Sequence, residues 1–396
     1  MPSAFLPSSA SLAHSSAPNP PLTVELAASL ETIGAQDWDR LAGEASPLTS
    51  YAFLHAMERS GSVDAQSGWI SRHLLLKAGD RLVGLCPAYA KLHSYGEYVF
   101  DHPWAEAFER AGGRYYPKLQ IAVPFTPATG RRLLADPRYY PALAEGLRAS
   151  TRQLQLSSAH VTFCQAEEAE ALAANGFLTR VGLQFHWHNQ GYETFDDFLA
   201  VLKSSKRKAI RKERREAEAS GLRFAALQGD AIEAWHWDHF FAFYQDTSDR
   251  KWNQAYLTRD FFTQLHDSLR DKMLLCLAFD GERPVAGALN FIGQNRLYGR
   301  YWGCLQHYKF LHFELCYYQA IDYAIAQKLE VVEAGAQGPH KLQRGYRPTL
   351  TYSSHWIEQS GLRNAVADFL ERERLSLVAQ QAELEREASP YAQPSG

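Results

Sequence analysis

The sequence has few cysteines, almost no net charge and no long apolar run. Its five cysteines are odd in number and none are spaced C-x-x-C, which argues against a disulfide scaffold or a zinc knuckle and favours a reducing cytoplasm. The net charge of −3, from 41 Lys and Arg against 44 Asp and Glu, excludes a molecule built as a whole to bind nucleic acid, so DNA is not an expected partner. No stretch approaches the roughly 20 apolar residues of a membrane span, so none is predicted.

Aromatic residues are plentiful, with 21 Phe, 20 Tyr and 9 Trp, and they supply enough apolar surface for a large core. At about 150 residues per domain, 396 residues suggest two or three domains. The two ends differ from the rest. Residues 1–21 are rich in Ser, Ala and Pro and contain no Lys or Arg, so they are predicted to be a disordered tail and not a secretory signal. Residues 389–396 have a similar composition and are predicted to be disordered as well.

One pattern occurs twice in the chain. Residues 77–90 (KAGDRLVGLCPAYA) and 278–291 (AFDGERPVAGALNF) both combine an apolar strand end, a Gly-Asp or Asp-Gly turn, charged residues and a second apolar strand, and their turn glycines, Gly79 and Gly281, lie 202 residues apart. Glycine tolerates the positive φ of a tight hairpin turn, so both segments predict hairpins. Helical and strand-like segments flank both copies in the same order. We therefore predict two copies of one α/β module, at about 22–190 and 191–388.

The predicted order of strands and helices resembles a GNAT-type acyltransferase module, and a pair of such modules resembles the Fem aminoacyltransferases of peptidoglycan synthesis. Four strings are similar to the signature of a FemAB-like, GNAT-superfamily group of predicted N-acyltransferases: LYGRYWGC (297–304), LHFELCYYQAIDYAI (311–325), GAQGPHKLQRGYRP (335–348) and YSSHWI (352–357). This resemblance implies an α/β (α+β) fold of tandem duplicated GNAT-like (Fem-like) modules, each a mixed, mainly antiparallel sheet flanked by helices. Pro339 departs from the family pattern, since it stands where a Glu is expected.

The string GAQGPHKLQRGYRP follows a predicted strand, where sites of α/β proteins usually lie. Gly335 and Gly338 would allow the backbone to approach a ligand closely. The cations Lys341 and Arg344 would suit a ligand with a phosphate or carboxylate, and the titratable ring of His340 could act as a proton acceptor. The expected site residues of this loop are Gly335, Gln337, Gly338, His340, Lys341 and Arg344. The alternative is a Gly-rich surface loop whose basic side chains are merely solvated.

Residues 300–318 (RYWGCLQHYKFLHFELCYY) join a predicted strand to a helix. By resemblance to the GNAT plan, this helix start would hold the pyrophosphate of acyl-CoA, and the expected donor contacts are Arg300, Tyr301, Trp302 and His312. The glycine-rich turn of that plan is absent, which disfavours acetyl-CoA and leaves room for a larger donor such as an aminoacyl-tRNA.

Two carboxylates are candidate proton acceptors for acyl transfer to an amine. Glu314 lies at the predicted helix start, and Glu333 ends the strand that leads into the Gly-rich loop. Burial would raise the pKa of Glu333 towards the working range of a base, unless Lys341 or Arg344 pairs with it. Cys316 shares a helix face with His312, either as a nucleophile or as a small buried hydrophobe.

Residues 203–215 hold eight Lys or Arg and a single acid, and they predict either a solvated helix face or a contact with a polyanion such as tRNA. Lys251 and Trp252 lie in a polar segment that either lines the substrate groove or is solvated. The histidine pairs 186/188 and 236/239 lack further ligands at a known spacing, so no metal site is predicted.

Together these features predict an N-acyltransferase that moves an acyl or aminoacyl group from acyl-CoA or an aminoacyl-tRNA to an amine of a small molecule or a cell-wall precursor. No bound cofactor is expected. Glu314, Glu333 or His340 would take the amine proton, while Lys341 and Arg344 would hold phosphate or stabilise the oxyanion. The main site is expected in the C-terminal module. The alternative is a non-catalytic Fem-like protein that binds a peptidoglycan precursor or another polyanion.

Overall fold

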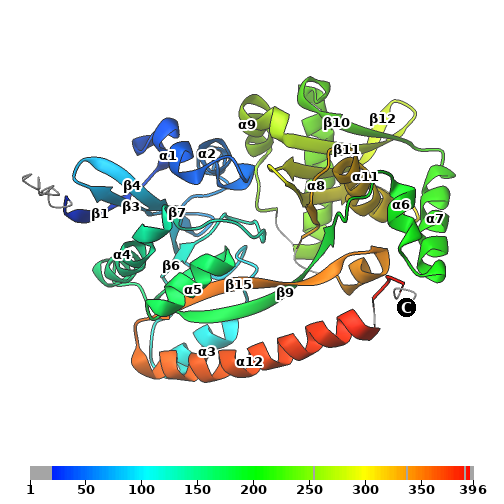
Figure 1. Cartoon of the computed structure of the whole chain (residues 1–396). Coiled ribbons are helices and arrows are strands. Elements are labelled where there is room, and N and C mark those ends of the chain that lie inside the picture. Colours follow the sequence, from blue (N-terminus) through cyan, green and yellow to red (C-terminus); the bar gives the residue numbers. More distant parts are fainter. Residues whose placement is uncertain (1–19, 253–254, 336–337, 388, 393–396) are drawn as a thin grey trace, which may run out of the picture.

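The computed structural model describes residues 20–252, 255–335, 338–387 and 389–392, which form two sheets flanked by helices (Figure 1). The smaller sheet has the order β1-β3-β4-β7, and the larger one has the order β10-β11-β12-β13-β14-β9-β15-β8-β6-β5-β2. The smaller sheet comprises β1 (Leu22–Ala27), β3 (His73–Ala78), β4 (Arg81–Cys86) and β7 (Leu134–Ala135). The larger sheet comprises β10 (Arg223–Gln228), β11 (Met273–Asp280), β12 (Arg283–Ile292), β13 (Arg296–Cys304), β14 (Val331–Glu333), β9 (Leu178–His188), β15 (Arg347–Ile357), β8 (Ser158–Cys164), β6 (Lys118–Ile121), β5 (Ala88–Lys91) and β2 (Trp69–Ser71).

The two predicted hairpins are confirmed as β3–β4 and β11–β12. Gly79 and Gly281 occupy equivalent turn positions, and each has a φ of 59°, which side chains other than glycine rarely adopt. The register of both hairpins shifts at equivalent places, between Leu76 and Lys77 and between Ala278 and Phe279, again 202 residues apart. The repeat in the sequence is therefore a repeat in the backbone, including its irregularities.

The last strand of each half lies between strands of the other half. Strand β9 pairs with β14 along one edge and with β15 along the other, while β15 also pairs with β8. The spatial order β14-β9-β15-β8 thus alternates between the two halves of the chain. The sheet therefore runs without a break across the predicted module boundary at residues 190 and 191.

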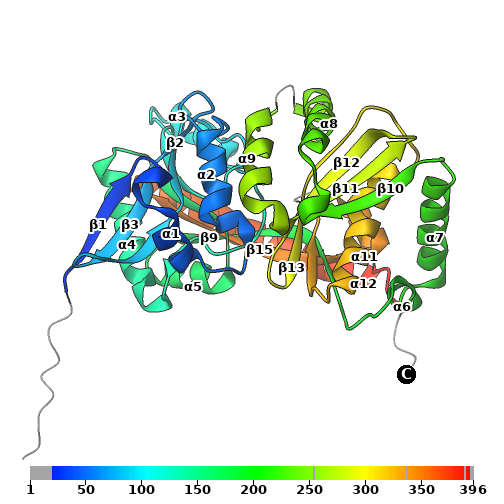
Figure 2. The ribbon, with the colours of Figure 1, turned by 90° about the horizontal axis from the view of Figure 1, so that it is seen from above.

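Helices cover the sheets on several sides (Figures 1 and 2). They are α1 (Ala35–Ala42), α2 (Tyr51–Arg59), α3 (His102–Arg110), α4 (Tyr140–Gln153), α5 (Ala166–Ala174), α6 (Phe195–Ala200), α7 (Ser204–Glu218), α8 (Ala234–Trp252), α9 (Arg259–Leu269), α10 (Leu311–Phe313), α11 (Gln319–Ala326) and α12 (Ser360–Glu387). The long helix α12 runs along β9 and β15 and contacts both strands. None of the described helices is long and apolar enough to cross a membrane.

The two halves share one apolar core. Helices α2 and α9 begin at the capping residues Ser50 and Thr258, whose side chains accept hydrogen bonds from backbone N–H groups of the first turn. The ring of Phe53 on α2 packs edge-on against Phe261 and Phe291 of the C-terminal half, at centroid distances of 5.8 and 5.2 Å. Fully burying each such ring contributes about 1.5–3 kcal/mol, so separating the halves would be costly.

Residues 389–392 pack against the rest of the protein, in contrast to the disorder that the composition of residues 389–396 predicts. Tyr391 forms a β-bridge with Leu202, and its hydroxyl donates to the carbonyl oxygen of Gly345 over 2.5 Å. The backbone N–H of Lys203 donates to the carbonyl oxygen of Pro390 over 2.8 Å. Residues 389–392 therefore tie the C-terminus to the start of α7.

Candidate functional site

The strands β13 and β14 separate beside the helical segment that follows β13. They pair in parallel only over Arg296–Tyr298 and Val331–Glu333. Beyond this point β13 continues to Cys304, while the chain leaves β14 towards the Gly-rich loop. On the other side, β12 and β13 shift register so that Leu289 faces Tyr301 and Asn290 faces Gly299. Arg300 is therefore the extra residue of a β-bulge, a device that redirects a side chain next to functional sites.

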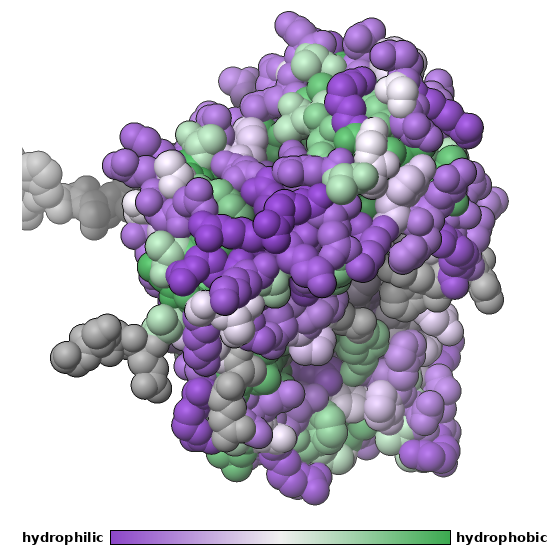
Figure 3. Space-filling view, turned by 90° about the vertical axis from the view of Figure 1, so that its right-hand side faces the viewer, coloured by the Kyte–Doolittle hydropathy of each residue, from purple (hydrophilic) through white to green (hydrophobic). Residues whose placement is uncertain are grey.

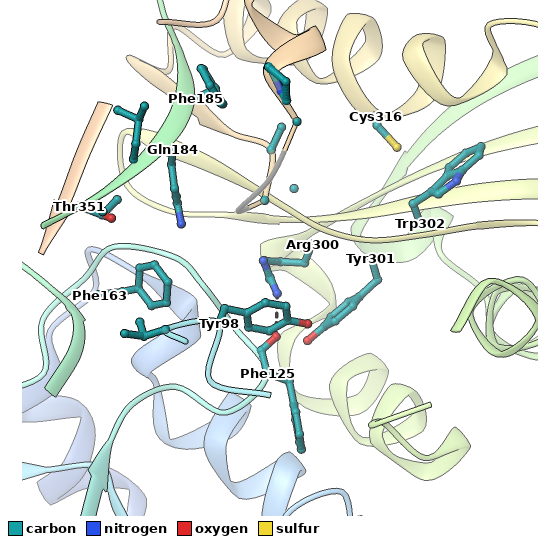
Figure 4. Close-up of a pocket in the computed structure, with 18 of the residues that line it drawn as sticks. Tyr98, Phe125, Phe163, Gln184, Phe185, Arg300, Tyr301, Trp302, Cys316 and Thr351 are labelled. Atoms are coloured by element: carbon teal, nitrogen blue, oxygen red, sulfur yellow. Dashed lines mark hydrogen bonds between the residues drawn. The ribbon is translucent and has the colours of Figure 1, made fainter. Parts of the chain in front are cut away.

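A cavity of about 1010 Å³ opens at this point, between the two halves (Figure 4). Its walls are residues 98–100 of a loop in the N-terminal half, 180–185 of β9, 299–302 of β13 and the helical segment around Cys316. Further walls come from the Gly-rich loop and from α12. Of the predicted residues, Arg300, Tyr301, Trp302, His312, Gly335, Gly338 and His340 line this cavity. The structure therefore gathers most of the expected binding residues into one place.

A histidine and a tyrosine face each other at the cavity wall. The Tyr317 hydroxyl lies 2.9 Å from Nε2 of His340, and both residues line the cavity. Burial and the nearby charges of Arg344 and Lys341 lower the pKa of His340, so its imidazole is neutral at neutral pH and can accept a proton. Tyr317 belongs to a π-helical turn, Glu314–Tyr318, of a kind often found at functional sites. Tyr317 is not among the site residues that the sequence predicts.

Lys341 and Arg344 lie behind the cavity wall. The Lys341 side chain is buried, and its Nζ donates to the carbonyl oxygen of Gly335 over 2.8 Å. Burial lowers the pKa of Lys341 to about 7. Arg344 pairs with Glu213 of α7 over 2.8 Å and stacks on the Phe313 ring. Both side chains therefore hold the Gly-rich loop in place.

The two predicted carboxylates are buried in ion pairs and do not line the cavity. Glu314 accepts a hydrogen bond from Arg214 over 3.1 Å, and burial is the main cause that raises its pKa. Glu333 pairs with Arg296 over 2.5 Å, and not with Lys341 or Arg344 as the sequence suggested. Both partners lie far away in the sequence, so neither pair could be predicted from spacing alone.

The remaining predicted features lie elsewhere. Gln337 is outside the described residues, as are the side chains of Lys251 and Trp252 at the end of α8. The basic run forms α7 on a hydrophilic face of the molecule (Figure 3). Part of its charge is paired with acids of the same chain, since Arg211 pairs with Asp196 and Arg214 with Asp322, each over 2.7 Å. Among the described residues, no three His, Cys, Asp or Glu side chains are grouped so that they could hold a metal ion.

A buried ion cluster anchors the loop wall at residues 98–100. Lys118 of β6 is fully buried, and its Nζ donates to Ser94 over 2.8 Å, to Glu97 over 2.7 Å and to Asp101 over 2.5 Å. These three partners flank the cavity-lining residue Tyr98 on both sides. One lysine of the sheet therefore fixes the shape of this wall.

Comparisons with known proteins agree with this architecture. A model of the FemAB-like family, described as peptidoglycan biosynthesis/recognition, matches residues 29–393. The structure of FemX has a similar fold, with a TM-score of 0.52 at 11% identity over 84% of this chain and 98% of FemX. L-PGS from Bacillus licheniformis gives 0.48 at 10% identity over 80% and 94% of the two chains. A tandem GNAT protein from the clavulanic acid biosynthesis pathway gives 0.46 at 11% identity over 85% and 98%. No curated protein matches the sequence.

Proposed function

The chain belongs to the FemAB-like family of peptidoglycan biosynthesis/recognition proteins, and on this basis we propose that it transfers an acyl or aminoacyl group from an activated donor to an amine. The observation that carries this proposal is the His340–Tyr317 pair at the wall of the cavity where β13 and β14 separate. A neutral imidazole in a cavity of this size is suited to accept the proton of an attacking amine.

In the proposed reaction, the amine nitrogen attacks the carbonyl carbon of the donor and a C–N bond forms. His340 accepts the amine proton, and the Tyr317 hydroxyl orients its ring. When the tetrahedral intermediate collapses, the bond to the leaving group breaks and the proton passes from His340 to that group. The leaving group is a thiolate for acyl-CoA or a ribose hydroxyl for an aminoacyl-tRNA.

The donor would enter along β13 and the helical segment that starts at Leu311. Trp302 and His312 line the cavity there, and their rings lie 5.2 Å apart in an edge-on contact. The turn between β13 and the helix carries Tyr308 and Phe310 where a glycine-rich phosphate cradle would need small residues. This turn favours a donor with a bulky or extended anionic part over acetyl-CoA.

The test is a transfer assay with acyl-CoA and charged-tRNA donors and with peptidoglycan precursors or small amines as acceptors. We expect one donor class to be consumed with formation of an amide, and His340→Gln to lose that activity. The matched control is His55→Gln, since His55 lies on α2 beside Glu31 and does not line the cavity. Consumption of neither donor class would contradict the proposal.

The missing glycine-rich turn also favours a second candidate, a protein that binds a peptidoglycan precursor without turnover. In that case the precursor would bind at micromolar concentration and His340→Gln would change its affinity or leave it unchanged, with no product formed from either donor.

A further inference from the structure

Arg300 carries a positive charge into the cavity without a matching carboxylate. Its Nη2 donates to the carbonyl oxygen of Phe125 over 2.7 Å, and its buried Nε has no acceptor among the described residues. No carboxylate of the described chain lies within 4.0 Å of its guanidinium, as an ion pair would require. The other guanidinium at the cavity, Arg180, differs in this respect, because Glu373 accepts from its Nε and Nη2 over 2.8 Å each.

A second cation lies near Arg300. Lys341 is buried, and its ammonium group donates a hydrogen bond to the neutral carbonyl oxygen of Gly335. Burial is the main cause that lowers its pKa, and the nearby charge of Arg300 lowers it further. The carboxylate that lines the cavity, that of Glu373, is already neutralised by Arg180. This part of the cavity is therefore short of negative charge, and a ligand with an oxyanion would supply it.

Two tyrosine rings, Tyr98 of the N-terminal half and Tyr301 of the C-terminal half, lie beside the Arg300 guanidinium (Figure 4). Phe125 also lines the cavity, but it meets Arg300 through its backbone carbonyl oxygen and its ring points away from the guanidinium. The Phe125 ring stacks on Tyr256 with centroids 4.8 Å apart and an interplanar angle of 12°, which gives a flat apolar wall. An apolar group attached close to the oxyanion would therefore be buried on binding.

We propose that Arg300 binds the carboxylate of the amine acceptor, and that the acceptor's apolar side chain lies against the aromatic wall. The acceptor is thus an α-amino acid or a peptide end in which carboxylate, amine and apolar side chain lie close together. The role as acceptor rests on the proposed function. A carboxylate matches the planar, paired donors of a guanidinium. A phosphate would bring about two negative charges, whereas Arg300 is the cation that lines the cavity without a carboxylate partner among the described residues, and Lys341 behind the wall is only partly charged because burial lowers its pKa to about 7.

The test measures binding to the full chain by calorimetry, without a donor. The probes are a panel of L-amino acids and their α-amides, with phenyl phosphate as the phosphate arm. We expect at least one apolar amino acid to bind ten- to a hundredfold more tightly than its amide, because the amide cannot form the charge-assisted pair. Arg300→Gln should remove this preference, and Arg300→Lys should keep part of it. Arg152→Gln, the matched control, should keep it in full, since Arg152 pairs with Glu358 at the surface and does not line the cavity. Melting temperatures verify that each variant is folded.

The inference is overturned by equal affinity for acid and amide, by a preference that survives Arg300→Gln, or by the absence of binding of any amino acid at millimolar concentration. If phenyl phosphate binds more tightly than every amino acid, the group that Arg300 binds is a phosphate, and the proposal that it binds a carboxylate is wrong. Because no donor is used, these results are independent of turnover. Transfer to amines with and without a carboxylate at equal kcat/KM would contradict this inference alone and leave the transferase function intact.

Discussion

Replacing Lys118 with methionine should destabilise the protein by about 3–5 kcal/mol near pH 8, which is the usual cost of removing one partner of a buried ion pair. Methionine has a similar length, so the change removes the charge and three hydrogen bonds more than it removes volume. It leaves the carboxylates of Glu97 and Asp101 without their cation, and their side chains are only 1% and 2% exposed. The magnitude therefore comes from two uncompensated buried charges.

The loss should depend on pH in a defined direction. In the native protein, burial already raises the pKa of Glu97 to about 7, and Lys118 opposes this shift. Without Lys118, the folded-state pKa of Glu97 would rise further above its unfolded-state value. The pKa of Asp101 would rise as well, because burial raises it and the charge of Lys118 is the main cause that holds it below its ordinary value in the native protein. Groups with raised pKa values favour the folded state at low pH and cost stability as the pH rises through them. The deficit of Lys118→Met should thus be clearly smaller at pH 5 than at pH 8.

Urea unfolding followed by tryptophan fluorescence at both pH values would measure these differences. Lys77→Met is the matched control, since Lys77 pairs with Glu25 at the surface, with side chains 31% and 51% exposed, and should cost less than about 1 kcal/mol. Adding Glu97→Gln and Asp101→Asn to Lys118→Met should restore most of the stability. A deficit below 1 kcal/mol for Lys118→Met, or one that does not change with pH, would refute the reasoning.

Three further predictions follow from the site and the sheet. His340→Gln should lower the rate of acyl transfer about 10²- to 10⁴-fold with little change in donor binding. In a profile of rate against pH, the wild-type rate should fall on the acid side with an apparent pKa below that of an ordinary histidine, because burial and neighbouring cations lower the pKa of His340. Glu314→Gln should lower the free energy of unfolding by about 1–3 kcal/mol in urea titrations but change the rate less than threefold, and a hundredfold loss of rate would return Glu314 to the reaction. Halves split after Gly191 should be insoluble alone and should co-purify when expressed together, because β9 and β15 each need partners from the other half; two soluble, monomeric halves would contradict this.

Local features of the fold could be predicted from the sequence. The glycine of each hairpin turn, the alternation of apolar residues around it and the offset of 202 residues are all visible in the printed chain, and the structure reproduces each of them. That residues on β13 and in the Gly-rich loop lie together at one cavity was also predictable, because they sit where a strand ends and the family strings lie.

Long-range partners could not be predicted in this way. Glu314 meets Arg214 across 100 residues, and the charge pattern of α7 gives no indication of which of its arginines turns inward. Arg300 reaches the cavity through a bulge, whose position depends on the register of two paired strands. The exchange of β9 and β15 between the two halves could not be predicted either. The pattern of apolar residues in each strand does not specify which strand lies beside it.

The alternating order β14-β9-β15-β8 also bears on how such a chain could arise. Two identical single-module proteins that exchanged their last strands would form a symmetric dimer with this same order. Duplication and fusion of their gene would then yield the present chain without any change of contacts. Such a dimer would have carried two equivalent clefts, and after fusion only one needed to keep its chemistry. The N-terminal half would then have been free to supply only a wall of the remaining cleft, as Tyr98 and Phe125 do in the present cavity.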